Sequence, residues 1–190
     1  MDNTNLPNET VLKSVIHWFE NAVLGLNLCP FAARPYQSGS IVFAISNAAD
    51  DEGVLSDLYL KLQELDESRE VETLVLICSQ HLAEFEDYNQ FLSLSDALLE
   101  QSGWLGEYQI ASFHPDYCFE GCEVDSRENW TNRSPYPILH LIRESSISSA
   151  IQHHADVDQI PQQNIKTMNN LSESQMQKIF RDRFEKKITK

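Results

Sequence analysis

Three short apolar runs, separated by stretches with helical periodicity, limit the fold of this chain most strongly. The runs are SIVFAIS (residues 40–46), TLVLICS (73–79) and YQIASF (108–113), and each has the length and composition of a strand. The helical positions between them are Leu55, Leu58, Leu62 and Leu65, then Phe85, Tyr88, Leu92, Ser95 and Leu99. Strands that alternate with helices of this length predict a βαβαβ core with right-handed crossovers and a mainly parallel sheet.

Further helices are expected at both ends of this core. Apolar residues recur at helical spacing from Val11 to Leu26 behind Thr10, the expected N-cap. Residues 172–190 predict an amphipathic C-terminal helix, which opens with the capping box SESQ. With 190 residues, we expect one small three-layer α/β domain spanning residues 1–190, in which residues 1–9 form a flexible N-terminus.

The charge balance argues against a nucleic-acid surface. The formal net charge is −15, and the last thirteen residues hold six of the fourteen Lys and Arg residues. Neutralising phosphates needs clustered basic groups, which the acidic body lacks. The sequence also has neither a membrane-spanning apolar stretch nor a signal peptide. We therefore expect a cytoplasmic protein without membrane or nucleic-acid partners, whose four cysteines remain reduced.

The carboxyl edge of the predicted sheet is the first candidate site, because ligands of open parallel sheets bind there. The third strand ends at His114-Pro115-Asp116-Tyr117, and the second ends before His81. Pro115 keeps the backbone of His114 extended, and Asp116 can orient or charge an imidazole nearby. His114 is therefore a candidate acid or base and His81 a weaker one. The alternative is that His114 only closes the strand.

An anion site is predicted just after the long irregular segment 114–133. The stretch SPYPILHLIRE predicts a helix with Ser134 as N-cap and Pro135 as its first residue. The N–H groups and the dipole of such a helix attract anions, and Asn132 and Arg133 add side-chain donors. We expect Tyr117, Asn132, Arg133 and Ser134 to bind a phosphate or carboxylate, although caps of this kind are also common in helices that bind nothing.

The same helix would place Tyr136, His140 and Arg143 on one face. A polar stripe on so apolar a helix faces either solvent or a cavity. In the second case, His140 becomes a further catalytic candidate.

Cys29, in LCPFAAR, has two opposite interpretations. If residues 30–33 form a short helix, Cys29 is its N-cap, and the helix dipole lowers the pKa of the thiol. If Cys29 instead ends the preceding helix, the potential there raises that pKa. A buried, inert cysteine is the third alternative.

A metal site is also consistent with the sequence. His114, Cys118 and Cys122 recur at four-residue intervals around Asp116, and zinc favours such ligands. Cys29, His140 or His81 would have to complete the set.

Three motifs in order, GLNLCPFA (25–32), FHPDYCFEG (113–121) and NRSPYPILHLIRE (132–144), resemble an uncharacterised bacterial family, domain of unknown function 1415. The resemblance covers nearly the whole chain and implies no activity. It places its signature on Asn27, Cys29, Pro30, His114, Pro115, Asp116, Tyr117, Asn132, Arg133, Ser134, Pro135 and His140. Cys118 and Cys122 depart from the family's pattern, which weighs against a metal site built on both.

Three hypotheses follow. The leading one is a small-molecule enzyme that binds an anionic ligand at the sheet's carboxyl edge, with Cys29, His114, Asp116 and His140 as catalytic residues. The second is a metal-binding protein that uses Cys29, His114 and His140. The third is a non-catalytic interaction module acting through the C-terminal helix. The sequence predicts no particular cofactor, reaction class or oligomeric state.

Overall fold

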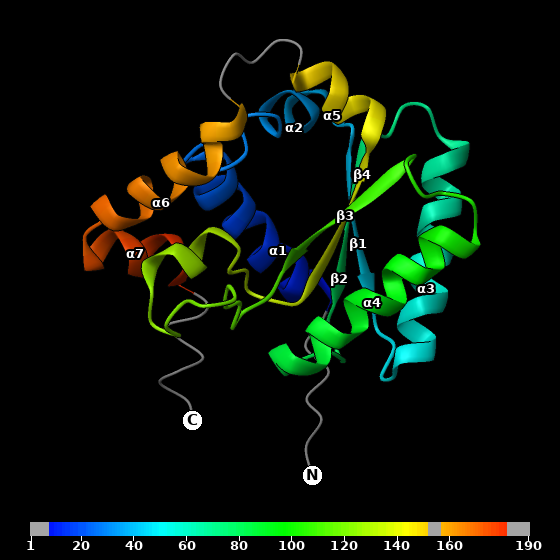
Figure 1. The fold of residues 1–190 in the computed structure, drawn as a ribbon, viewed down its shortest axis with the longest axis horizontal. Helices are drawn as coiled ribbons and strands as arrows, with labels where there is room; N and C mark the ends of the chain where they lie inside the picture. The colour runs from blue at the N-terminus through cyan, green and yellow to red at the C-terminus, as the bar shows by residue number, and fades with distance from the viewer. Residues whose placement is uncertain (1–7, 152–156, 182–190) are drawn as a thin grey trace.

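The four strands of the fold form one open sheet, in a computed structural model that describes residues 8–151 and 157–181 (Figure 1). They are β1 (Ile41–Ser46), β2 (Thr73–Cys78), β3 (Tyr108–Phe113) and β4 (Ile138–Arg143), in the order β1-β2-β4-β3. The three predicted strands are confirmed. Every residue of β2 is buried, as expected for an apolar run that is covered on both faces.

Strand β4 is the main departure from the sequence-based expectation. β1 and β2 are parallel, but β4 is antiparallel to both of its neighbours, β2 and β3. The expected mainly parallel sheet is therefore wrong, and the sheet is mixed. β1, β2 and β3 still point the same way, so their carboxyl ends share one edge, and β4 begins at that edge.

The expected helix over residues 135–144 is wrong for a physical reason. Pro137 disfavours a helical conformation at the preceding residue, and an inserted strand satisfies the backbone edges of both β2 and β3. In β4, Leu139 and Leu141 are buried on one face of the sheet, and Ile138 is buried on the other. A strand thus buries the same apolar residues that suggested a helix.

Two crossover helices cover the first face of the sheet, which we call the α3 face. They are α3 (Asp51–Glu67) and α4 (Phe85–Gln101), both as predicted. Their apolar residues pack with Leu139 and Leu141 of β4. The side chain of Asp50 caps α3 by accepting a hydrogen bond of 2.8 Å from the Gly53 N–H.

The opposite face, which we call the α1 face, is covered first by α1 (Asn8–Trp18) and its π-helical continuation (Phe19–Leu24). Helix α1 begins at Asn8, so the segment expected to be flexible is already helical at residues 8 and 9. Thr10 lies inside the helix and is not its N-cap. The short helix α2 (Ala33–Ser38) then leads into β1.

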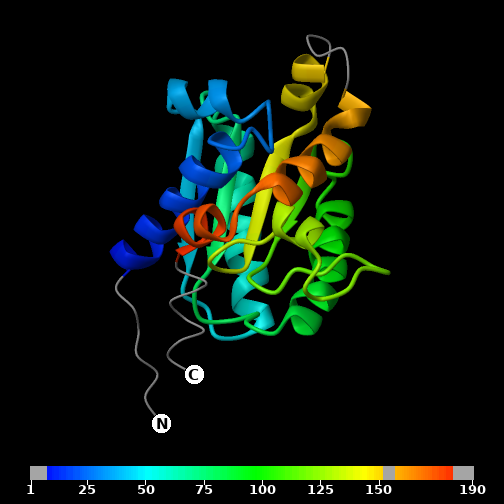
Figure 2. The ribbon, with the colours of Figure 1, turned by 90° about the vertical axis from the view of Figure 1, so that its left-hand side faces the viewer.

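The C-terminal part of the chain completes this cover. It consists of α5 (Glu144–Ile151), a 3-10 turn (Val157–Gln159), α6 (Ile160–Asn170) and α7 (Glu173–Ile179). Figure 2 shows α6 and α7 lying across the α1 face beside α1. The predicted capping box at Ser172 is confirmed, but α7 ends at Ile179, and residues 182–190 lie outside the described part. No described helix is long and apolar enough to cross a membrane.

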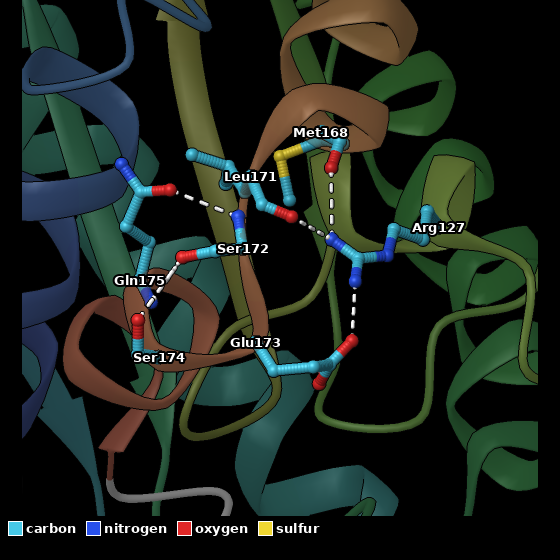
Figure 3. A network of polar contacts seen from close by, with 7 residues as sticks. All are labelled: Arg127, Met168, Leu171, Ser172, Glu173, Ser174 and Gln175. Atoms are coloured by element: carbon cyan, nitrogen blue, oxygen red, sulfur yellow. Dashed lines mark hydrogen bonds and ion pairs between the residues drawn. The ribbon is translucent and has the colours of Figure 1, made fainter.

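Arg127 joins these C-terminal helices to the long loop before β4. It opens a 3-10 helix, η2 (Arg127–Thr131). Its Nη1 donates to the carbonyl oxygens of Met168, at 3.2 Å, and Leu171, at 2.6 Å. Its Nη2 pairs with the carboxylate of Glu173 (Figure 3). Because helix C-termini leave carbonyl groups without helical partners, Arg127 caps α6 and ties α6 and α7 to η2.

Candidate functional site

The segment of residues 114–134 brings several predicted site residues together at the carboxyl edge of the sheet. The His114 N–H donates to Asn132 O at 3.2 Å, and the Ser134 N–H donates to His114 O at 3.4 Å. The side chain of Asn132 adds a bond of 3.1 Å from Nδ2 to Ser112 O. These bonds hold residues 132–134 against the end of β3, out of register with the β3–β4 pairing. We call residues 114–134 the stapled segment.

His114 is fully buried, and backbone groups contact both of its ring nitrogens. The Asp116 N–H donates to Nδ1 at 3.0 Å, and Nε2 lies 3.0 Å from Leu82 O. Because Nδ1 accepts, Nε2 must carry the proton and donate to the carbonyl. Phe85 and Tyr88 pack against the ring, at 5.3 and 5.1 Å between centroids. This geometry holds the ends of two loops together, and an acid or base role for His114 stays a prediction.

Arg133 lies inside the stapled segment and is 3% exposed. Its Nε donates to Tyr117 O at 3.1 Å, and its Nη2 donates to Val124 O at 2.6 Å. The guanidinium also lies 5.1 Å from the centroid of the Trp130 ring, within the range of a cation–π contact. The expected anion contact for Arg133 stays a prediction, because the contacts observed here are to the protein's own backbone and a ring.

Asn129 is a structural residue that the sequence reasoning missed. Its side chain is fully buried. Oδ1 accepts from the Phe119 N–H at 3.0 Å, and Nδ2 donates to Glu123 O at 2.9 Å and Val124 O at 3.2 Å. One amide thus satisfies three backbone groups of the irregular segment. The sequence contains no periodic signal for such a residue.

The helix N-terminus on which the predicted anion site depended does not form. Ser134 has no regular secondary structure, Pro135 and Tyr136 form a bend, and the chain enters β4 at Ile138. Ser134 Oγ donates to Tyr136 O at 2.6 Å, so Ser134 is neither an N-cap nor next to a first helical turn. The helix dipole and the first-turn N–H groups are therefore absent at this place in the described structure. Pro137 was the sequence signal against the helix.

The expected stripe of Tyr136, His140 and Arg143 is consequently wrong as well. Alternate residues of a strand point to opposite faces, so His140 and Arg143 lie on different faces of β4. Arg143 donates from Nε to Val71 O at 3.1 Å and from Nη1 to Tyr108 Oη at 2.8 Å. It therefore binds backbone and side-chain oxygens near the opposite, amino edge of the sheet.

His140 is a predicted catalytic residue whose imidazole has one nitrogen without a hydrogen-bond partner among the described residues. Its Nε2 lies 2.5 Å from Thr73 Oγ1, and Thr73 donates its only hydroxyl proton to Leu141 O at 2.7 Å. Thr73 can therefore only accept from His140, so Nε2 carries the ring proton. No described residue forms a hydrogen bond with Nδ1. Burial lowers the pKa of His140 to about 4, which keeps the ring neutral at pH 7.

The part of the α1 face around His140 is less covered than the part around Val75, Ile77 and Ile138. Along β4, Ile138 is fully buried, whereas His140 and Ile142 keep partial exposure. β4 is an inner strand of the sheet, so this exposure comes from the face and not from a sheet edge. The ring of Phe113 lies beside the imidazole, at 6.3 Å between centroids.

Cys29 matches neither helix-end interpretation. The preceding π-helix ends at Leu24 with Gly25 as C-cap, and α2 has Ala32 as N-cap. Cys29 instead opens a turn in which the Ala32 N–H donates to Cys29 O at 3.1 Å. Burial raises the pKa of its thiol, and hydrogen bonds from the Phe31 and Ala32 backbone oppose this increase. Cys29 packs against the apolar residues of the α1 face.

The predicted residues thus separate into two groups. His114, Asp116, Tyr117 and the Asn132–Ser134 run belong to the stapled segment at the carboxyl edge. Cys29 and His140 belong to the α1 face. His81, the weaker candidate, lies at the carboxyl end of β2 and pairs with Asp51 of α3 at 2.7 Å.

The described residues contain no group of three or more His, Cys, Asp or Glu side chains placed to hold a metal ion. Cys118 and Cys122 do lie in one turn, where Cys118 Sγ is 3.5 Å from Cys122 O. The expected metal set of Cys29, His114 and His140 spans both groups of residues, and metal binding stays a prediction.

The comparisons with known proteins point to one family. No curated protein and no solved structure matches the chain. A family model does match residues 10–178, and its description is "Protein of unknown function (DUF1415)". This range includes both the stapled segment and the residues around His140. The chain therefore belongs to the DUF1415 family, as its three motifs predicted.

Proposed function

We propose that this protein is an enzyme that acts on a small molecule, and that His140 is its proton acceptor. The observation that carries the proposal is the imidazole with Nε2 committed to Thr73 and no described partner at Nδ1. His140 is partly exposed, so a ligand that approaches over the α1 face can reach the imidazole.

The hydrogen bond between Thr73 and His140 favours a role for His140 as a catalytic base over a role in packing alone. Thr73 fixes which nitrogen is protonated, and Leu141 O fixes the orientation of the Thr73 hydroxyl. Catalytic and metal-binding imidazoles commonly have one nitrogen held in this way while the other does chemistry. The arrangement leaves the lone pair of Nδ1 available to a ligand O–H or N–H group.

The low pKa of His140 fits a proton acceptor that works on a bound ligand. At about 4, the pKa keeps the lone pair available throughout the neutral range. A negative charge that develops on the ligand raises the pKa of a neighbouring imidazole. Proton transfer to Nδ1 thus becomes favourable as the ligand ionises, and the imidazolium keeps its Nε2 hydrogen bond to Thr73.

The surroundings of His140 support a ligand with an apolar or aromatic part. Phe113 flanks the ring, and Ile142 follows it on the same face of β4 with partial exposure. Small-molecule sites are mostly lined by such side chains, with few polar groups that set orientation. In this proposal Cys29 is a neighbour on the α1 face, and its catalytic role stays a prediction.

The interaction-module alternative has less support. The apolar stripe of the predicted C-terminal helix includes Met176 and Phe180. Both side chains are buried in the core of the α1 face, with 3% and 5% exposure. These side chains serve the protein's own fold and are not available to a partner. Ile179 of the stripe is partly buried against the same core, and its remaining members, Phe184 and Ile188, lie outside the described residues.

The test combines a ligand screen with nitrogen NMR of the histidines. A library of small molecules with acidic O–H or N–H groups is screened by thermal shift, and binders are added to protein with 15N-labelled histidine. We expect binders that move the Nδ1 resonance of His140 and no longer bind His140→Phe. The matched control is His81→Phe, which changes another partly exposed histidine.

Two results would contradict the proposal. One is a set of binders that perturbs no His140 resonance and binds His140→Phe as well as wild type. The other is a His140 spectrum in the ligand-free protein with the proton on Nδ1. Thr73→Val removes the acceptor for Nε2, so we expect it to allow both tautomers and to weaken binding.

A further inference from the structure

We propose that Cys118 and Cys122 form a redox-active dithiol, which small-molecule disulfides such as glutathione disulfide convert into an intramolecular disulfide. The site lies in the turn at the start of the stapled segment. It is separate from the His140 region on the α1 face and does not depend on the proposed enzyme activity.

The turn brings the two cysteines together. The Cys122 N–H donates to Phe119 O at 3.1 Å, and Gly121 adopts the left-handed conformation with φ of 76°. Glycine adopts this conformation without the strain that a side chain would add. Cys118 Sγ lies 3.5 Å from Cys122 O. A disulfide needs such a close approach of the two residues.

Partial exposure together with a second cysteine in the same turn distinguishes this pair from the other cysteines. All four cysteines lie in the described part of the chain, and all are free thiols. Cys78 is buried in β2, and burial raises the pKa of its thiol to about 12. Cys29 has no second cysteine in its turn. Cys118 and Cys122 are both partly exposed, so a soluble oxidant can reach them.

The reaction balances through two exchanges. The thiolate of one cysteine attacks a sulfur of glutathione disulfide, forms a mixed disulfide and releases one glutathione thiolate, which takes up a proton. The second cysteine, as its thiolate, then attacks the protein sulfur of the mixed disulfide and releases the second glutathione. Two protein thiols are oxidised, and one disulfide is reduced to two glutathione molecules.

Glu128 controls how readily Cys122 reacts. The thiol of Cys122 donates a hydrogen bond to the Glu128 carboxylate, and this contact raises the pKa of Cys122 to about 11. The same contact lowers the pKa of Glu128. Since the thiolate is the nucleophile, Glu128 slows attack by Cys122 at neutral pH. Glu128→Gln should therefore speed disulfide closure several-fold.

A disulfide between Cys118 and Cys122 would constrain the backbone of the stapled segment. Asn129 Nδ2 lies 3.8 Å from Cys118 Sγ and bonds the same loop at Glu123 and Val124. Oxidation removes the S–H group that Cys118 directs at Cys122 O and replaces this contact by a covalent bond. We therefore expect the oxidised turn to be cleaved more slowly by added protease.

The experiment uses the reduced full-length chain in glutathione buffers of increasing oxidised fraction, followed by alkylation and mass spectrometry. We expect the oxidised protein to carry two alkyl groups fewer than the reduced protein and its peptide map to join Cys118 to Cys122. Cys118→Ser and Cys122→Ser should each stop at the mixed disulfide with glutathione, whereas Cys29→Ser should still close the bond. Glu128→Gln should close it faster than wild type.

Full alkylation of both cysteines in the most oxidising buffer would overturn the proposal. So would a wild-type protein that stays at the mixed disulfide, because the two sulfurs would then be unable to meet. Circular dichroism of each variant shows whether the fold is retained, and Cys118→Ala and Cys122→Ala provide a second pair should a serine variant unfold.

Discussion

Asn129→Ala should strongly destabilise the protein by removing the buried amide that holds the stapled segment. The amide makes three hydrogen bonds to backbone groups and is fully buried. A typical intramolecular hydrogen bond contributes about 0.5–1.5 kcal/mol. The loss should therefore be roughly 3 kcal/mol in the free energy of unfolding. In a chain of this size that lowers Tm by about 6–12 °C.

Urea unfolding followed by tryptophan fluorescence measures this loss, because Trp130 adjoins the altered residue. Asn89→Ala is the matched control: Asn89 is exposed on α4, so the same substitution should change the free energy of unfolding by less than about 0.5 kcal/mol. The reasoning is refuted if the two variants unfold at the same urea concentration. The stapled segment would then not be held by its buried amide.

Three further predictions concern other parts of the fold. Arg127→Ala should cost about 1–3 kcal/mol by leaving the carbonyl groups of Met168 and Leu171 without a donor, and faster hydrogen exchange in α6 should report it. His140 takes up no proton in the folded state until the pH approaches 4, whereas the unfolded chain does so near 6.5. The free energy of unfolding should therefore fall by up to roughly 3 kcal/mol as the pH is lowered from about 6.5 to about 4. This pH-dependent loss should be absent in His140→Gln. Phe180→Ala should cost about 3 kcal/mol in thermal unfolding, and a neutral result would show that the C-terminal helix does not depend on this contact.

Local sequence patterns correctly predicted the elements whose formation depends on residues that are close together in the chain. Residues 73–78 form a buried strand because a short run of apolar, largely branched side chains suits the centre of a sheet. The Ser172 capping box forms because its partners lie three residues apart. The position of His114 at the end of β3 was also predicted correctly, because the residue that follows a strand in the sequence must lie at the carboxyl end of that strand.

The partners of the candidate residues could not be predicted in the same way. His114 Nε2 bonds Leu82 O, which comes from a loop 32 residues earlier, where Leu82 itself adopts a left-handed φ of 61°. The tautomer of His140 depends on Thr73, which is 67 residues away in sequence. Such contacts depend on strand register, and a shift of one residue would turn His140 to the opposite face.

The sequence by itself determined the family, the two crossover helices α3 and α4, three of the four strands and the acidic net charge. The tertiary structure decided whether ILHLIR is a helix or a strand, because that apolar pattern suits both and only the open backbone edges of β2 and β3 favour the strand. That one decision removed the helix N-terminus beside Arg133 and placed His140 on a sheet face. The proton transfer that we propose at Nδ1 of His140 thus depends on backbone hydrogen bonds that no local stretch of sequence encodes.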